Sequence, residues 1–283
     1  MLIIKISALL VAVIGFLLCF RGSKTALVGE LKEAIDSKHI ITYYQPIVNY
    51  ITGEIHGVEV LARWIHPIKG IISPDVFIPI AEKNGLIITL TQYIMQNVKN
   101  DLDNLSDLIP ENFHIGINVS ATYLKSEGLS LDCLDFIHSF AHKKISLVLE
   151  ITEREPINIT KDEVIQLMEL RSQGVKLALD DFGTGYSGLS CLINPIFDII
   201  KIDKIFVSMI GSEHESSRIV DCIIELTQKM SLIVVAEGVE TRNQVQYLID
   251  MGVELLQGYF VTPPLTLIEF ANILLEKRYT TSE

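Results

Sequence analysis

The 283-residue chain contains only four cysteines, and no two of them are spaced as C-x-x-C. This scarcity argues against a disulfide framework and against a structural zinc site. None of the seven histidines belongs to an H-E-x-x-H zinc motif. The chain also lacks a G-x-x-x-x-G-K-[ST] loop, and no G-x-G-x-x-G follows its first strand-like run. Nucleotide-binding loops of these two types are therefore not predicted.

Basic residues are scarce as well, with 23 lysines and arginines against 35 acidic residues and a formal net charge of −12. This balance disfavours binding to long nucleic acids, which requires a basic surface. It leaves room for a small anionic substrate held by metal ions. A hydrophobic content of 49% and a charged content of 20% indicate a globular chain with a sizeable core, in one large domain or two small ones.

The first stretch of the chain is strongly apolar from Met1 to Phe20, with Lys5 as its only charge. Its length is about the 20 residues that a bilayer requires. A cleaved signal peptide is the main alternative, but no small-x-small cleavage site follows, and Arg21 stands where cleavage is expected. We therefore expect residues 1–24 to form an uncleaved anchor with a basic flank. A longer protein that had been truncated at this point would look the same.

Arg21 and Lys24, directly after the apolar run, favour a cytoplasmic position for the rest of the chain. The predicted localisation is therefore the inner (cytoplasmic) membrane, crossed once, with a catalytic domain over residues 25–283 in the cytoplasm.

Strand-like and helix-like segments alternate over the rest of the chain. The β-branched runs Ile40–Val48 and Ile55–Trp64 flank a Thr52-Gly53 turn and predict an antiparallel pair. Ser73-Pro74-Asp75 predicts the capped start of a helix that ends at Asn84-Gly85. Four S/T-x-x-E/Q capping motifs open later helical patterns, at Thr160, Ser212, Thr241 and Thr266. About eight strands over roughly 250 residues predict an α/β fold, a modified TIM (β/α)8 barrel with one antiparallel strand, preceded by the N-terminal transmembrane helix.

Polar residues follow the apolar runs at the points where the predicted strands end. In a barrel enzyme the chemistry lies at these strand ends. Each residue alone is more readily explained as a strand end that faces solvent, and the Asp180-Asp181 pair as a solvated turn in which one Asp caps a helix. Because the strands of a closed barrel converge, the set predicts one common site, consisting of Glu59, Asn118, Glu150, Asp180, Asp181, Lys201, Glu237 and Gln257.

Five carboxylates crowded at one mouth repel one another and raise each other's pKa values. Divalent cations remove this penalty. Oxygen ligands, including the amide of Asn118, favour Mg²⁺ or Mn²⁺ over zinc. The number of carboxylates favours two ions bridged by one Asp, for which we choose Asp180. Two-metal oxygen sites are typical of phosphoester cleavage.

Two basic residues, Lys201 of this set and Arg63 beside it, have open roles. Lys201 either orients or deprotonates the attacking water, or neutralises phosphate charge, or forms a purely structural salt bridge with Asp181. Arg63 lies four residues after Glu59 and so on the same strand face. It either holds a phosphate oxygen bidentately or pairs with a neighbouring acid. The residues alone thus predict a metal-dependent barrel enzyme that acts on a phosphoester, without naming the substrate.

Several longer motifs make a family resemblance visible. They are Y-Q-P at Tyr44–Pro46, E-V-L-A-R-W at Glu59–Trp64, N-V-S at Asn118–Ser120, E-I-T-E at Glu150–Glu153, D-D-F-G-T-G-Y-S at Asp180–Ser187, K-I-D at Lys201–Asp203, A-E-G-V-E at Ala236–Glu240 and Q-G-Y at Gln257–Tyr259. With this set the chain closely resembles the EAL-domain family of cyclic di-GMP phosphodiesterases, from about Tyr43 to the C-terminus. The resemblance implies two Mg²⁺ or Mn²⁺ ions and hydrolysis of cyclic di-GMP to linear pGpG, which lowers this second messenger and so affects biofilm and motility signalling.

The resemblance also implies roles for single residues. Lys201 resembles the water-activating residue of the family and forms the catalytic set with Glu59 and Glu237. The metal ligands implied in this way are Glu59, Asn118, Glu150, Asp180, Asp181 and Glu237. Gln45, Arg63 and Gln257 resemble substrate contacts. Glu153 and Glu240 resemble the acids that hold the loop after Asp181 and support activation within a homodimer.

The chain departs from the family pattern at a few positions. Val60 stands in the signature where alanine is usual, and Gly188 replaces a serine of the loop. Neither change removes a catalytic group. A catalytically silent cyclic di-GMP receptor that acts through a protein partner is the alternative function, although such members typically lack metal ligands. A barrel phosphoesterase with another substrate is a third, weaker alternative.

Overall fold

The computed structural model describes residues 26–141, 143, 145–152, 160–184, 196–211 and 214–276. The chain divides into two compact units, Met1–Ile41 with Arg63–Leu90 and Thr42–Ala62 with Thr91–Glu283. The predicted membrane anchor, residues 1–24, lies outside the described residues. Among the helices that are described, none is both long enough and apolar enough to cross a bilayer.

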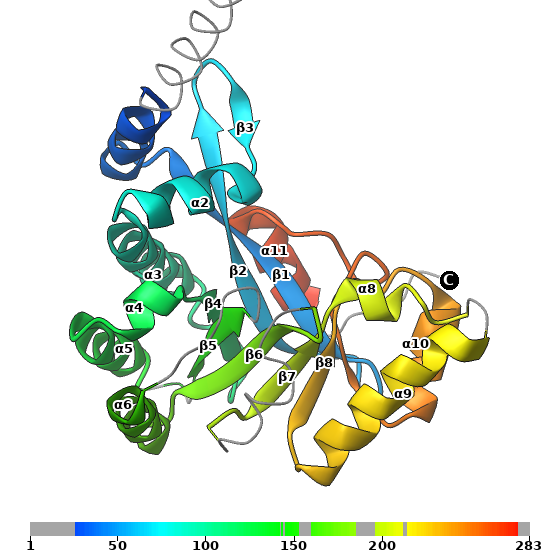
Figure 1. Ribbon diagram of the computed structural model, residues 1–283. Coiled ribbons are helices and arrows are strands. Elements are labelled where there is room, and N and C mark those ends of the chain that lie inside the picture. The colour runs from blue at the N-terminus through cyan, green and yellow to red at the C-terminus, as the bar shows by residue number, and fades with distance from the viewer. Residues whose placement is uncertain are drawn as a thin grey trace, which may run out of the picture. The chain divides into compact units, whose positions relative to one another are not determined.

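The larger unit is built on a closed barrel of eight strands (Figure 1). From β2 to β9 neighbouring barrel strands pair in parallel, whereas β1 pairs antiparallel with β9 and closes the barrel against β2. The barrel with one antiparallel strand, predicted from the sequence, is thereby confirmed. Its strands are β1 (Ile40–Asn49), β2 (Glu54–His66), β4 (His114–Asn118), β5 (Ser146–Thr152), β6 (Lys176–Phe182), β7 (Ile199–Ile202), β8 (Ile233–Ala236) and β9 (Leu255–Leu256).

Helices α5, α6, α9 and α10 lie around the outside of the barrel strands (Figure 1). The capping boxes predicted at Thr160 and Thr241 are both formed at the starts of α6 and α10, and Thr266 exchanges equivalent hydrogen bonds with Glu269 before α11. Ser212 lies outside the described residues. The helices of this unit are α4 (Ala121–Leu124), α5 (Gly128–Ser139), α6 (Lys161–Ser172), α8 (Lys204–Val207), α9 (His214–Lys229), α10 (Arg242–Asp250) and α11 (Leu267–Glu276), and most of α3 (Ile87–Asn104) belongs to it as well.

The smaller unit contains helical residues 26–36, the end of β2, the short strand β3 (Gly70–Ile72) and α2 (Pro74–Lys83). β3 pairs with β2 in a hairpin that the sequence pattern did not predict. Trp64 packs edge-to-face against Phe77, with ring centroids 6.2 Å apart. The helix predicted from Ser73 is present, but the side chain of Ser73 makes no capping bond. Its hydroxyl donates instead to Asp75 at 3.3 Å, which corrects the predicted cap.

One apolar layer fills the middle of the barrel. It consists of buried side chains from six strands, namely Ile47, Val148, Ala178, Ile199, Val235 and Leu255. Alternate residues of a strand point to the same side, so residues two positions further on also face the interior. Those positions hold Glu150, Asp180, Lys201, Glu237 and Gln257 on the parallel strands, and Gln45 two residues before Ile47 on the antiparallel β1. The register of the core thus directs the polar residues to one mouth of the barrel.

Candidate metal and phosphoester site

Lys201 lies at the centre of the polar layer. Its side chain is buried, and its Nζ contacts four carboxylates from four different strands or strand ends. The distances from Nζ are 2.6 Å to Glu237, 2.8 Å to Glu150, 3.0 Å to Glu59 and 3.4 Å to Asp180. The long-range pairing of β2, β5, β6 and β7 therefore brings together residues that are far apart in the chain.

Glu59 is held on its other sides by amide groups. The Nδ2 of Asn118 donates to Glu59 Oε1 at 3.1 Å, and the Nε2 of Gln257 donates to Glu59 Oε2 at 2.6 Å. Gln257 Nε2 also lies 3.2 Å from Gln45 Oε1. Asn118 is exposed whereas Glu59 is buried, so this network runs from the open end of the site into the barrel.

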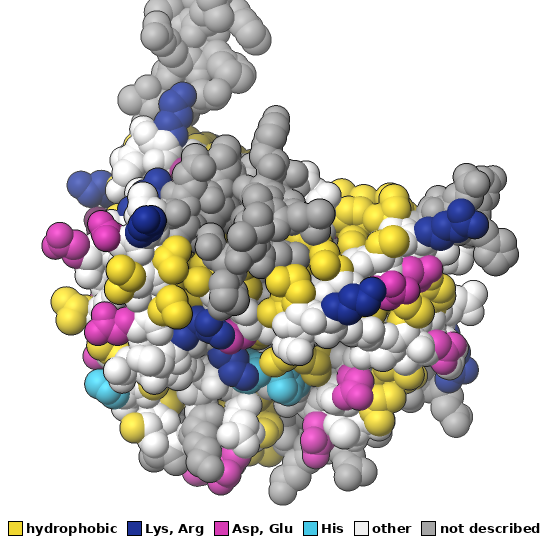
Figure 2. All heavy atoms as spheres, turned by 60° about the horizontal axis from the view of Figure 1, so that its bottom comes forward, with side chains coloured by type: hydrophobic (Ala, Val, Ile, Leu, Met, Phe, Trp, Pro, Cys, Tyr) yellow, Lys and Arg dark blue, Asp and Glu magenta, His cyan; other side chains and the backbone are white. Residues whose placement is uncertain are grey.

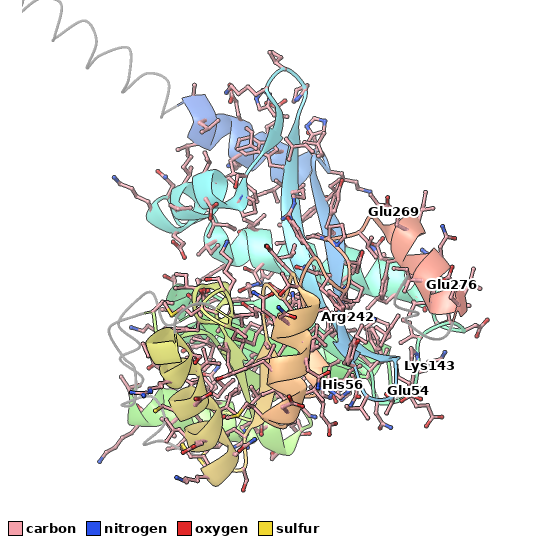
Figure 3. All side chains as sticks on the ribbon, turned by 90° about the vertical axis from the view of Figure 1, so that its right-hand side faces the viewer. Glu54, His56, Lys143, Arg242, Glu269 and Glu276 are labelled. Carbon is pink, nitrogen blue, oxygen red and sulfur yellow. The ribbon has the colours of Figure 1, made fainter. Side chains whose placement is uncertain are left out.

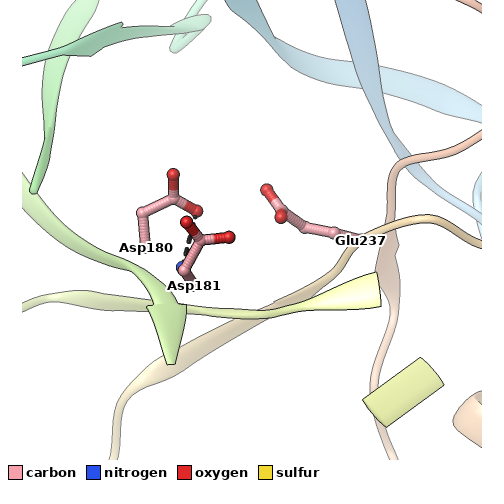
Figure 4. Close-up of side chains that lie close together, drawn as sticks. All are labelled: Asp180, Asp181 and Glu237. Atoms are coloured by element: carbon pink, nitrogen blue, oxygen red, sulfur yellow. Dashed lines mark hydrogen bonds between the residues drawn. The ribbon is translucent and has the colours of Figure 1, made fainter. Parts of the chain in front are cut away.

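Asp180, Asp181 and Glu237 point their carboxylates into one space (Figure 4). One oxygen from each lies within 4.8 Å of the others, a spacing that fits metal ligands. Asp181 adopts a left-handed backbone, with φ of 54°, which costs free energy for a residue other than glycine. Its backbone N–H donates to Asp180 Oδ1 at 3.0 Å. This strained turn lets two consecutive residues serve the same site although a regular strand would direct them to opposite sides.

Gly116 on β4 gives the site the space it needs. A Cβ at this position would lie 2.1 Å from Glu150 Oε1, far inside van der Waals contact. Only a glycine therefore allows the Glu150 side chain to cross the neighbouring strand towards Lys201. A glycine within an apolar strand is the sequence signal for such a close approach, and our reading of the sequence missed it at this residue.

The pKa values of the site are shifted because several carboxylates surround the single ammonium of Lys201. Burial alone would lower the pKa of Lys201, but the surrounding carboxylates raise it well above its usual value. Burial raises the pKa of Glu150 to about 8 and also raises the pKa values of Asp180 and Glu237. For Glu59 the charge of Lys201 and the hydrogen bond from Gln257 outweigh burial, so its pKa is lowered. Burial and crowding thus disfavour the ionised forms of Glu150, Asp180 and Glu237, whereas the charge of Lys201 favours them.

Divalent cations fit this donor set. Five carboxylates and one ammonium leave four negative charges uncompensated when all are ionised, the charge of two divalent ions. Carboxylate and amide oxygens are the ligands that Mg²⁺ and Mn²⁺ prefer. The Oε1 of Gln257 is buried without a hydrogen-bond partner, as expected of an oxygen whose partner is an ion, a water or a ligand. Asp180, Asp181 and Glu237 could hold one ion directly, and Glu59, Asn118 and Glu150 lie beside them.

The other residues singled out in the sequence lie outside this cluster of contacts or outside the described residues. Arg63 is half-buried on β2, within the smaller unit. Glu240 is exposed, and its backbone N–H donates to Gln244 Oε1 at 2.8 Å. Val60 is buried on the opposite side of β2 from Glu59. Glu153 and Gly188 lie outside the described residues, so their predicted roles stay predictions.

Comparison with known proteins agrees with this geometry. The sequence-family model of the EAL domain matches residues 28–264 of the chain. The chain belongs to the EAL domain family. It is 46% identical over 264 residues to the probable cyclic di-GMP phosphodiesterase PdeG of Escherichia coli K12, which covers 93% of the chain and 52% of PdeG. It is 44% identical over 231 residues to the cyclic di-GMP phosphodiesterase PdeL of the same organism, covering 82% of the chain and 64% of PdeL.

This EAL chain thus spans about half the length of PdeG and less than two thirds of PdeL. Solved structures share its fold. The complex of the PaMucR phosphodiesterase with c-di-GMP superimposes with a TM-score of 0.76 at 30% identity, covering 87% of the chain and 99% of the PaMucR chain. The EAL enzyme Bd1971 with bound cAMP and cyclic di-GMP gives a TM-score of 0.81 at 30% identity, covering 89% of the chain and 69% of the Bd1971 chain.

Proposed function

We propose that this EAL domain hydrolyses cyclic di-GMP to linear pGpG with the help of two Mg²⁺ or Mn²⁺ ions. The observation that carries the proposal is the buried cluster of carboxylates around Lys201, with Asp180, Asp181 and Glu237 spaced as metal ligands. The names of PdeG and PdeL, and the ligand in the PaMucR complex, supply the substrate. Lowering of the second messenger, with effects on biofilm or motility signalling, would be the consequence in the cell.

Each residue of the site has its own role in the proposed reaction. Bound divalent ions supply Lewis-acid polarisation of phosphoryl oxygens and a water of lowered pKa. These ions would be held by six residues, namely Glu59, Asn118, Glu150, Asp180, Asp181 and Glu237. Lys201 keeps its ammonium at the centre of the site, where it can donate to a phosphate oxygen or to the attacking water. Gln257 orients Glu59 and is itself held by Gln45, and both glutamines would contact the substrate, Gln257 through its Oε1 as an acceptor.

The proposal includes three further features. Arg63 would bind a phosphate oxygen of the substrate. Glu153 and Glu240 would hold the loop after Asp181 and couple it to a homodimer. Residues 1–24 would anchor the protein in the inner membrane, with the barrel in the cytoplasm.

A turnover assay with product identification tests the function. The full chain in mild detergent, supplied with Mg²⁺ or Mn²⁺, should convert cyclic di-GMP to pGpG, as seen by chromatography. Glu225→Gln, an exposed change on α9, should retain this activity and so serves as the matched control for site variants. Binding of cyclic di-GMP without turnover in either metal would overturn the proposal in favour of the receptor alternative.

A further inference from the structure

A second cluster of titratable side chains lies at the opposite mouth of the barrel, where the parallel strands begin. Figure 2 turns this end towards the reader, and histidine and lysine or arginine side chains gather near the centre of the face. Figure 3 shows His56 and Glu54 at this amino end of the barrel. The described residues that form the cluster are His56 on β2, His114 on β4 and Lys176 on β6. None of them contributes to the proposed hydrolysis.

The three bases are in direct contact. The imidazole rings of His56 and His114 meet edge-to-face with centroids 4.2 Å apart, and Lys176 Nζ lies 2.9 Å from His114 Nε2. A Cβ at Gly57 would lie 2.6 Å from the carbonyl oxygen of His114. The glycine therefore lets the backbones of β2 and β4 approach closely enough to bring the two rings together.

Asp198, the acid whose charge acts on Lys176, is bound by other groups. The carboxylate of Asp198 accepts two hydrogen bonds from the Arg171 guanidinium and a third, at 2.9 Å, from the backbone N–H of Leu177. None of the contacts between described residues joins Asp198 to Lys176, so the negative charge of Asp198 acts on the Lys176 ammonium only from a distance. Burial lowers the pKa values of His56, His114 and Lys176, and the charges of neighbouring bases lower those of the two histidines further. The cluster thus contains several hydrogen-bond donors, and no acid among the described residues is in contact with it.

A buried atom of the cluster is left without a partner. His56 Nε2 is inaccessible to solvent and makes no hydrogen bond to any residue that the structure describes, a state that costs free energy unless a ligand or water completes it. His56 and His114 also line a small cavity within the barrel, with room for little more than one water-sized group. The apolar layer forms most of its wall, and Glu150 and Lys201 border it on the side of the acidic mouth.

We propose that His56, His114 and Lys176 form a binding site for a small oxyanion at the amino end of the barrel. Lys176 supplies the charge, and the unpartnered Nε2 of His56 supplies a donor to one oxygen of the anion. A transition metal fits less well, since the Lys176 ammonium occupies His114 Nε2 and no carboxylate of the described residues joins the two rings. The proposed hydrolysis uses the other mouth and none of these three bases, although Glu150 and Lys201 border the same internal cavity.

Inorganic phosphate is the probe for this site, and the histidine ring signals in an NMR spectrum of the full chain are the readout. Titration with phosphate in EDTA, at constant ionic strength, should shift the ring signals of His56 and His114. Lys176→Met should weaken phosphate binding by about tenfold or more. Lys229→Gln, which removes an exposed lysine from α9, should leave it unchanged.

Two further measurements keep the test decisive. Circular dichroism verifies that Lys176→Met is folded, and His56→Gln provides a second variant that should also weaken binding. The absence of any phosphate-dependent shift of these two rings would overturn the proposal, because a bound water would then be sufficient to satisfy His56. An unchanged phosphate affinity in folded Lys176→Met and His56→Gln would overturn it as well.

Discussion

Glu59 and Val60 are neighbours on β2 with opposite tasks, since one side chain faces the site and the other the surrounding core. Glu59→Gln keeps the size of the side chain but removes a charge that Lys201 and two amides orient. We expect turnover to fall by at least about tenfold, equivalent to roughly 1.4 kcal/mol of activation free energy. Steady-state kinetics at saturating Mg²⁺ measure this change.

Val60→Ala is the matched control at the next position. It restores the residue that is usual in the signature and removes two buried methyl groups. We expect turnover within about twofold of the original, and a free energy of unfolding lower by about 2 kcal/mol. A large loss of turnover in folded Val60→Ala would show that packing behind β2 also determines the position of Glu59.

Gly116→Ala tests the space that Glu150 requires. The new methyl group would collide with Glu150 Oε1, so the carboxylate must leave Lys201. We expect weaker Mg²⁺ activation, with a higher metal concentration needed for half-maximal turnover. Gly128→Ala on α5 is the control, because its Cβ would lie at ordinary contact distances of 3.4 Å from Ser126 Oγ and 3.8 Å from Asp132 Oδ2. Equal metal dependence in the two variants would contradict the role given to Gly116.

At the scale of elements, two helix starts that look alike in sequence differ in structure. Thr241 and Gln244 form a complete capping box on α10, whereas Ser73 makes no capping bond on α2. Thr241→Ala should therefore lower the free energy of unfolding by about 1 kcal/mol. Ser73→Ala should change it by less than about 0.5 kcal/mol. Urea unfolding followed by circular dichroism compares the two, and equal losses would refute this distinction.

Among the helices and strands, some features could be predicted from the sequence and others could not. Alternation along the strands and the capping boxes identified the barrel, its antiparallel β1 and the polar strand ends such as Glu150 and Asp180, because these are local periodicities. The hairpin strand β3 was missed, since three residues carry too short a pattern. The four contacts of Lys201 and the left-handed turn at Asp181 depend on how distant strands pair. No local pattern contains that information.

At the scale of the whole molecule, the barrel is polarised along its axis. Acids surround Lys201 at one mouth, the apolar layer fills the middle, and bases occupy the other mouth. Burial and the neighbouring acids raise the pKa of Glu150 at one end, and burial and the neighbouring bases lower the pKa of His114 at the other. A TIM-type barrel usually places chemistry at the carboxyl ends of its strands and stability at the amino ends. The basic mouth should therefore influence how folding responds to pH.

His114 gives that response a definite sign. Burial, followed by the charges of His56 and Lys176, lowers its pKa from 6.5 to about 3. Between these values the unfolded chain binds a proton that the folded chain excludes, so the stability present above pH 6.5 is lost as the pH falls through this window. At about pH 5 the loss due to His114 should be about 2 kcal/mol.

Urea unfolding of the full chain at about pH 7.5 and about pH 5, in phosphate-free buffer with EDTA, measures this loss. Other groups titrate in the same range, so the informative quantity is the difference between the original chain and His114→Gln, whose amide does not titrate. The variant is less stable at the higher pH because it loses the acceptor for Lys176, but it should lose less stability on acidification. If both proteins lose the same amount, His114 is not buried as a neutral ring, and the electrostatic account of the basic mouth is wrong.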